Sequence, residues 1–184
     1  MLDLLVQTGA ILEGHFLLSS GKHSSRYIQC AKIFERPNYG EKIGKAIAGK
    51  IAHHEPHVVV GPALGGVILA YEVARHLNAR AMFTEREDGQ MKLRRNFHIE
   101  VGERVAIVED VTTTGKSVLE VAEVVQKHGG VVCCIASIVD RSVEKLPFDV
   151  PFYSLVKLEL PIFEPDDCPL CRQNVPLVKP GSRK

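Results

Sequence analysis

The amino-acid sequence predicts an α/β fold in which helices cover both faces of a mainly parallel, twisted sheet. Short runs of apolar, often β-branched residues recur along the chain, and each is followed by glycine, a polar turn or charged residues. The segments between them carry apolar residues three or four positions apart, the spacing of a helix with one buried face. Runs that are apolar throughout are typical of parallel strands covered on both sides, and ligands of such sheets bind at the carboxyl ends of the strands.

These patterns divide one expected domain, residues 1–184, into three regions. Residues 1–40 are rich in serine, glycine and aromatic residues, interrupt the alternation of strands and helices, and are expected to form an N-terminal hood. Residues 41–160 are expected to form the α/β core, and the five prolines of residues 161–184 predict an irregular surface tail. The expected strands lie at residues 58–60, 81–83, 105–108, 131–139 and 152–156, and the expected helices around residues 43–51 and 118–125.

Composition excludes several classes of protein. Hydrophobic residues make up 45% of the chain and charged residues 24%, as in globular proteins and unlike disordered or fibrous ones. The formal net charge is +1, so we expect neither nucleic acid nor a membrane surface as a partner. Residues 1–13 are acidic and lack the features of an export signal, and five irregularly spaced cysteines do not suggest a disulfide framework. The protein is therefore predicted to be cytoplasmic.

The strongest functional signal lies in residues 105–117, where an expected strand ends in Glu109 and Asp110. A hydroxyl-rich turn follows, and then a helix expected to begin near Ser117, with Ser117 and Glu120 as a capping box. Free backbone N–H groups and the helix dipole make such a turn a cradle for phosphate. Because the two carboxylates would repel a phosphate alone, the ligand should also carry hydroxyl groups or a metal, as a ribose 5-phosphate does.

Two other phosphate-binding patterns are excluded. A Walker A loop needs glycine five residues before Gly115, and Asp110 stands there. The run Gly61–Gly66 lacks the spacing of a dinucleotide-binding fingerprint. An ordinary strand and turn without a ligand is the remaining alternative for residues 105–117.

Residues 105–115, VAIVEDVTTTG, resemble the phosphoribosyl pyrophosphate (PRPP) signature of the type I phosphoribosyltransferases. Residues 14–27, GHFLLSSGKHSSRY, are similar to the hood of the orotate phosphoribosyltransferases, and the similarity extends through Gly61–Gly66 and Asp140–Arg141. The resemblance implies the type I fold and transfer of a phosphoribosyl group from PRPP to orotate, which gives orotidine 5′-monophosphate and pyrophosphate in pyrimidine biosynthesis. It also implies Mg²⁺ as cofactor, held mainly through PRPP with no certain protein ligand.

The resemblance further assigns roles to individual residues. Glu109 and Asp110 would orient the ribose hydroxyls and stabilise the cationic sugar of the transition state, and Lys92 would stabilise the leaving pyrophosphate. These three are the implied catalytic residues. The implied PRPP-binding residues are Leu64, Gly65, Arg86, Lys92, Arg94, Glu109, Asp110, Val111, Thr112, Thr113, Thr114, Gly115, Lys116 and Ser117.

The loop Gly61–Gly66 follows an expected strand and opens an expected helix, so its backbone can approach a ligand closely. In the family this loop faces the pyrophosphate and often holds a non-proline cis peptide, which we place at Ala63–Leu64. Gly65 stands where many relatives carry lysine. A tight turn that binds nothing is the alternative.

Residues 91–98 hold Lys92, Arg94, Arg95 and His98 without an acid. A mobile basic loop could clamp the departing pyrophosphate and exclude water. In the family this loop reaches into the neighbouring subunit's site, which implies a homodimer with two shared active sites. A solvated basic turn is the alternative.

Arg141 follows an expected strand, and its planar fork of donors suits a carboxylate or imide oxygens. The resemblance implies that Arg141 and Thr113 bind orotate and that Tyr27 and Ile28 cover its ring. Residues 20–22 would lie near the sugar phosphate, with Lys22 replacing a lysine that many relatives carry at Ser19. A surface salt bridge is the alternative for Arg141.

Cys168 and Cys171 have the spacing of half a zinc site. No second pair of this kind exists, and the histidines at 53, 54 and 57 are distant in sequence, so the metal-free interpretation is favoured and a metal site is the alternative.

Two other functions stay open: transfer to another base, such as hypoxanthine or adenine, and a non-catalytic regulator that binds PRPP or a nucleotide. The hood and Arg141 favour orotate, and the basic segment favours an enzyme.

Overall fold

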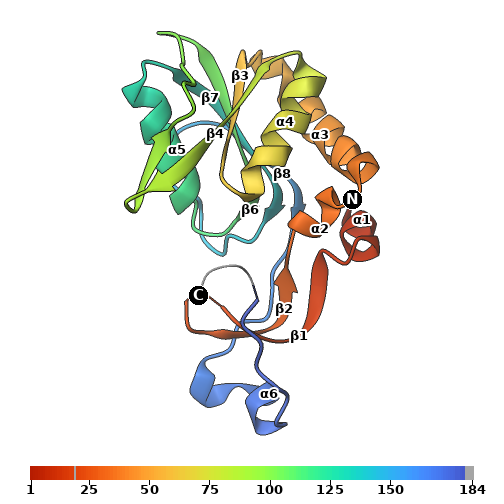
Figure 1. The fold of residues 1–184 in the computed structure, drawn as a ribbon. Coiled ribbons are helices and arrows are strands. Elements are labelled where there is room, and N and C mark those ends of the chain that lie inside the picture. Colours follow the sequence, from red (N-terminus) through yellow and green to blue (C-terminus); the bar gives the residue numbers. More distant parts are fainter. Residues whose placement is uncertain (19, 181–184) are drawn as a thin grey trace.

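The computed structural model describes residues 1–18 and 20–180 and contains a six-stranded central sheet (Figure 1). The strand order is β5-β4-β3-β6-β7-β8, and each neighbouring pair is parallel except β4 and β5. The predicted, mainly parallel sheet is therefore confirmed. The strands are β3 (Val58–Pro62), β4 (Arg80–Glu87), β5 (Gln90–Leu93), β6 (Arg104–Thr112), β7 (Val131–Asp140) and β8 (Phe152–Lys157).

Helices cover both faces of the sheet, and each face has its own apolar core (Figure 1). On one side lie α3 (Pro37–Ile51), the 3-10 turn η1 (Ala52–His54) and α4 (Gly65–Leu77), and on the other lies α5 (Lys116–Lys127). Val105 and Ile107 of β6 pack on the α5 side, whereas Ala106 and Val108 pack on the α3 and α4 side. Because alternate residues enter different cores, the strands are apolar throughout. None of the helices in the described ranges is long and apolar enough to span a membrane.

The first residues form a hood next to the core (Figure 1). It consists of α1 (Leu2–Gln7), β1 (Ile11–Leu17), β2 (His23–Ile28) and α2 (Ala31–Phe34), and β1 and β2 make a separate antiparallel sheet. Cys30, between β2 and α2, lies with its Sγ 3.8 Å from the carbonyl oxygen of Asp110. The hood therefore meets the core where β6 ends.

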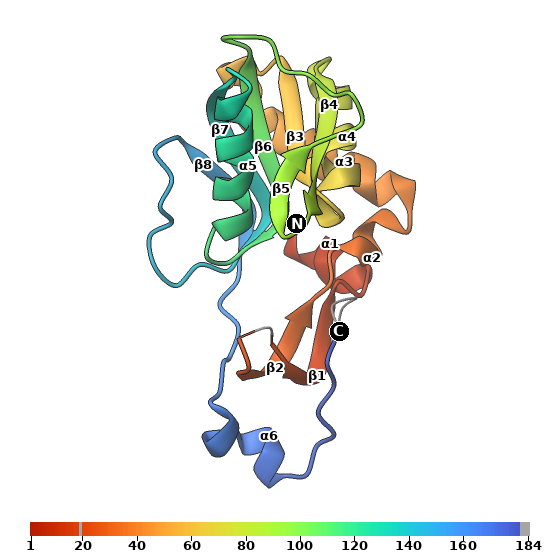
Figure 2. The same cartoon turned by 60° about the vertical axis from the view of Figure 1, so that its left-hand side comes forward.

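The tail after β8 runs along the hood hairpin, and Figure 2 shows it passing on both sides of β1 and β2. Phe163 pairs with His23 of β2, and Val178 pairs with Phe16 of β1. The tail was expected to be irregular, but it contains η2 (Pro165–Asp167) and α6 (Pro169–Arg172). Each turn begins with a proline, which fits a first helical turn because no N–H is needed there. The last four residues of the expected tail, 181–184, lie outside the described residues.

Candidate active site

The order of the strands creates a crevice at the carboxyl ends of β3 and β6. From β3 the chain passes through α4 to β4 on one side, whereas β6 lies on the other side of β3. The loops after β3 and β6 therefore leave in different directions, and a crevice of this kind is the usual ligand site of an open α/β sheet. The two loops are residues 61–66 and 109–117.

Asp110 lies directly against the loop after β3. Its Oδ1 accepts a hydrogen bond of 2.8 Å from the backbone N–H of Val111. A Cβ atom built on Gly65 would lie only 2.4 Å from Oδ2 of Asp110, so a side chain at position 65 would displace the carboxylate. Glu109 is only 8% exposed, and its Oε1 accepts a hydrogen bond of 3.2 Å from the N–H of Asp110. Glu109 therefore lines the cavity after β6, and Asp110 next to it faces the start of α4 at Gly65.

Cys30 supports this acid pair, and the sequence analysis did not identify it. Burial raises the pKa of its thiol well above the usual value, and the charges of Asp110 and Glu109 raise the pKa further. The thiol therefore stays neutral and joins the hood to β6. The two contacting residues are 80 positions apart, so no local pattern connects them.

The turn after β6 surrounds a cavity of about 490 Å³. Gly115 caps α5 with φ of +77°, and a Cβ atom there would lie 2.7 Å from the ring of Phe148, so the position requires glycine. The cavity is open to the amino end of α5, where backbone N–H groups lack helical partners. Its lining residues are Arg86, Glu109, Val111, Thr112, Thr113, Thr114, Gly115, Lys116, Ser117 and Val118.

The predicted capping box is wrong. The helix begins at Lys116 with Gly115 as its N-cap, so Ser117 already lies inside it, and the N–H of Lys116 donates a hydrogen bond of 3.4 Å to Oγ1 of Thr114. Glu120 instead forms an ion pair with Arg86, whose Nη1 also donates a hydrogen bond of 3.0 Å to the carbonyl oxygen of Gly89. These contacts hold Arg86 at the edge of the cavity.

A second cavity, of about 740 Å³, adjoins the first and contains Arg141. Thr113 and Thr114 line both cavities, so the two are neighbours. Burial lowers the pKa of Arg141, whereas the nearby Tyr27 of the hood raises it. Within the described ranges, Nε of Arg141 is buried without a hydrogen-bond partner, and so is Oγ1 of Thr112. Arg141 lines the second cavity and Thr112 the first, so a ligand bound in these cavities would lie beside both residues.

The basic segment differs from the expected loop. Gln90–Leu93 forms the edge strand β5, which pairs with β4 and brings acids beside the cations. Lys92 Nζ lies 2.6 Å and Arg94 Nη2 3.2 Å from the carboxylate of Glu87. The hydrogen bond from Lys92 lowers the pKa of Glu87, and the charge of Arg94 adds to the effect. Because these ion pairs are exposed, they contribute little to the free energy of unfolding. An anionic ligand can therefore replace the carboxylate of Glu87 as the partner of the two cations.

The loop after β3 contains the predicted cis peptide, Ala63–Leu64, and this prediction is confirmed. A Cβ atom on Gly61 would lie 2.3 Å from the carbonyl oxygen of Gly66, so the turn is too tight for a side chain there. Leu64 is 81% exposed, and Ile68 and Tyr71 are exposed after it along α4. These three apolar residues are called the α4 patch below.

Three residues predicted in the hood lie apart from the cavities described above. Ile28 is buried in the apolar core, and Lys22 forms an ion pair of 2.6 Å with Glu164 of the tail. Ser20 is exposed, and Ser19 is outside the described residues.

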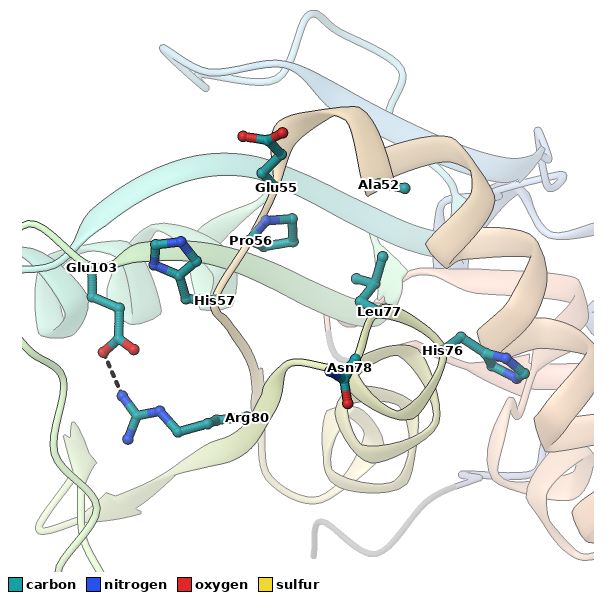
Figure 3. A pocket seen from close by; sticks show the side chains of 9 residues that line it. All are labelled: Ala52, Glu55, Pro56, His57, His76, Leu77, Asn78, Arg80 and Glu103. Atoms are coloured by element: carbon teal, nitrogen blue, oxygen red, sulfur yellow. Dashed lines mark hydrogen bonds and ion pairs between the residues drawn. The ribbon is translucent and has the colours of Figure 1, made fainter.

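Figure 3 shows a further hollow, of about 630 Å³, at the opposite edge of the sheet. His57 precedes β3 and Arg80 begins β4, so the hollow lies at the amino ends of these strands. Two of its charged residues, Arg80 and Glu103, pair with each other. The hollow therefore lies away from the acid pair and contains no residue that the sequence analysis selected.

Comparisons with known proteins agree with this geometry. Residues 30–170 match the family model described as the phosphoribosyl transferase domain. The chain is 58% identical over 181 residues to an orotate phosphoribosyltransferase of Thermotoga maritima, which covers 98% of this chain and 97% of the relative. It is 56% identical over 184 residues to one of Caldanaerobacter subterraneus, covering 100% of this chain and 97% of the relative. The crystal structure of orotate phosphoribosyltransferase from Aeropyrum pernix has a TM-score of 0.73 at 27% identity, covering 86% of this chain and 94% of that one.

Proposed function

The chain belongs to the orotate phosphoribosyltransferases of the phosphoribosyl transferase domain family, and we propose that the crevice between β3 and β6 is its active site. The enzyme transfers the phosphoribosyl group of PRPP to orotate and forms orotidine 5′-monophosphate and pyrophosphate. The observation that best supports the proposed site is that two cavities share Thr113 and Thr114. One suits a phosphorylated sugar and the other an acidic base, side by side.

The reaction joins a ring nitrogen of orotate to C1 of ribose while the bond from C1 to pyrophosphate breaks. Positive charge develops on the sugar, so the protein needs no nucleophile and acts by positioning and electrostatics. We assign the 5-phosphate to the turn Thr112–Ser117 and the ribose hydroxyls to Glu109 and Asp110. The backbone of Leu64 and Gly65, together with Arg86, Lys92 and Arg94, would bind the pyrophosphate.

Mg²⁺ fits this site. Glu109 lines the cavity and Asp110 is its neighbour in β6, and the hard oxygen donors of these carboxylates suit Mg²⁺ held mainly by phosphate and sugar oxygens. When bound, Mg²⁺ would neutralise charge on the pyrophosphate. The dependence of the rate on Mg²⁺ is best tested by omitting Mg²⁺ rather than by adding a chelator that also removes other metals.

A cytoplasmic location stays a prediction from the sequence.

The direct test follows the ultraviolet absorbance of orotate in the presence of PRPP and Mg²⁺. Consumption of orotate with release of pyrophosphate, and its loss when either PRPP or Mg²⁺ is omitted, is expected. Binding of PRPP without turnover of any base would instead support a regulator. Turnover of adenine or hypoxanthine but not orotate would support transfer to another base, which the position of Arg141 in the second cavity disfavours because purines carry no carboxylate for its guanidinium to bind.

Arg141→Gln is expected to raise KM for orotate roughly 10- to 100-fold, because hydrogen bonds to a charged group are lost. KM for PRPP should change little, since Arg141 lines the second cavity and not the one assigned to the sugar phosphate. Initial rates with each substrate varied in turn measure both constants. Arg141→Lys is the control for charge, and its KM for orotate should lie between those of the wild type and Arg141→Gln. An unchanged KM for orotate would show that Arg141 does not bind the base.

We propose further that the enzyme is a homodimer with shared active sites. The α4 patch, Leu64, Ile68 and Tyr71, is an exposed apolar surface at the start of the helix that lines the crevice. Apolar patches of this kind are typical of protein interfaces. An interface there would place the neighbouring subunit beside the crevice. The basic segment of each subunit would then be within reach of the other subunit's crevice.

Mixing two inactive variants tests this arrangement. If Lys92 acts in the partner's site and Asp110 in its own, a heterodimer of Lys92→Ala and Asp110→Asn contains one intact site. After subunit exchange, an equal mixture should recover about one quarter of wild-type activity, because half of the dimers are mixed and each has one working site. A mixture no more active than the average of its two components would show that the sites are not shared. The double variant mixed with wild type serves as the control for exchange.

A further inference from the structure

A cluster of four metal-ligating side chains lies at the junction of the hood and the tail, away from the crevice. His15 and His23 come from β1 and β2, and Cys168 and Cys171 come from the tail. One ligand atom from each residue lies within 4.8 Å of those of all the others. Three of the four side chains are buried, and Cys171 is exposed.

The local structure explains why these residues converge. His23 pairs with Leu17 across the hairpin, and His15 lies in a β-bulge of β1 between Glu13 and Phe16. The ring centroids of the two histidines are 4.8 Å apart, so both side chains lie on the same side of the hairpin. The backbone pairing of Phe163 with His23 brings the tail to this face. Cys168 caps α6 and Cys171 lies within it, so one helical turn presents both sulfurs.

Several distances within the cluster are close to those of a tetrahedral zinc site, and all four ligand atoms lie within 4.8 Å of one another. Nε2 of His15 and Nδ1 of His23 are 3.0 Å apart. Sγ of Cys168 is 3.5 Å and Sγ of Cys171 3.8 Å from Nε2 of His15, and Sγ of Cys171 is 3.3 Å from Nδ1 of His23. Zinc bonds of about 2.0 Å to nitrogen and about 2.3 Å to sulfur place the ligand atoms of a tetrahedron roughly 3.3 to 3.8 Å apart.

The second shell around His15 has the arrangement expected of a ligand. Its Nδ1 lies 2.8 Å from the carbonyl oxygen of Val175, and a carbonyl can only accept. The proton is therefore on Nδ1, which leaves the lone pair of Nε2 directed at the cluster. A hydrogen bond from the second ring nitrogen to a carbonyl is the usual way in which a zinc-binding histidine is oriented.

We propose that His15, His23, Cys168 and Cys171 bind one Zn²⁺ as a structural site that fastens the tail to the hood. Two thiolates and two neutral imidazoles balance the charge of the ion, and two protons leave the thiols when it binds. Four protein ligands complete the coordination, which is typical of structural and not of catalytic zinc. The ion would hold the β1–β2 hairpin, which carries Tyr27, independently of the chemistry at the crevice.

The test measures metal in the tag-free protein purified from cells grown with added zinc. Mass spectrometry of the metal content should give one zinc per chain in wild type and in Cys133→Ser, whose cysteine lies in β7. The double variant Cys168→Ser with Cys171→Ser should contain none. Wild type loaded with Co²⁺ in place of zinc should show the visible absorption of a tetrahedral site and charge transfer from thiolate.

The readouts do not depend on transferase activity, so they separate this proposal from the assignment of the active site. Wild type without bound zinc after growth and dialysis with the metal would overturn the proposal. So would full zinc content in the cysteine double variant, or a cobalt spectrum without thiolate bands. If the double variant fails to fold, the wild-type stoichiometry and the cobalt spectrum decide.

Discussion

Replacing Asp110 by asparagine is expected to lower kcat for orotidine 5′-monophosphate formation by roughly 10²- to 10³-fold while leaving the fold intact. The substitution removes a negative charge from the place where the sugar becomes positive in the transition state. Asparagine is nearly the same size, and its amide oxygen can still accept the hydrogen bond that Oδ1 of Asp110 accepts from the N–H of Val111. The loss should therefore be electrostatic and appear in kcat.

Initial rates at saturating orotate and PRPP, with thermal unfolding measured in parallel, test this prediction. Asp149→Asn is the matched control, because Asp149 is exposed and lies outside both cavities at the crevice. It should keep wild-type rates. An Asp110→Asn enzyme with wild-type kcat would mean that the acid pair does not stabilise the reacting sugar.

Replacing Lys92 by alanine has the second largest expected effect, a loss of about 10²-fold in kcat. The ammonium group would stabilise the charge that accumulates on the departing pyrophosphate. In the structure Lys92 pairs with Glu87 on the exposed edge of the sheet, so loss of this pair should change the free energy of unfolding by less than about 1 kcal/mol. Activity and stability should therefore separate clearly.

The rate of pyrophosphate release measures the effect of Lys92→Ala. Lys127→Ala is the control, since Lys127 is also exposed and paired with a glutamate, but lies at the far end of α5. Lys92→Arg keeps the charge and should restore part of the rate. Full activity in Lys92→Ala would mean that another cation of the segment, such as Arg94, stabilises the pyrophosphate.

Local sequence patterns were enough to predict the core of the fold and the position of the acid pair and its turn between β6 and α5. The apolar runs gave the strands because both faces of each strand are buried, as in β6. The acid pair and the hydroxyl-rich turn are contiguous, so their position at the end of β6 followed from the strand itself. The glycines of the loop after β3 were recognisable for the same reason.

The basic segment shows a signal that was present but not used. Asp88 and Gly89 both have positive φ and join β4 to β5 in a two-residue turn, with Glu87 paired to Gln90. An Asp-Gly pair between extended segments is a strong predictor of a hairpin. It would have placed the acids of β4 beside the cations that were expected to form a free loop.

The remaining features depend on contacts between distant parts of the chain. His15 and Cys168 are 153 positions apart in the sequence, and they are close in space because the tail returns along the hood. The spacing of Cys168 and Cys171 suggested half of a zinc site, but the sequence alone could not show which residues supply the other two ligands. The burial of Arg141, whose Nε has no partner among the described residues, likewise cannot be inferred from the sequence pattern of a single strand end.

A crystal structure with PRPP and Mg²⁺ would show whether the crevice after β3 and β6 binds the phosphoribosyl group. Our assignment places the 5-phosphate on the backbone of Thr112–Ser117 and the ribose hydroxyls within hydrogen-bond distance of Glu109 and Asp110. Density for PRPP at the opposite edge of the sheet, in the hollow of Figure 3, with none at this turn, would contradict it.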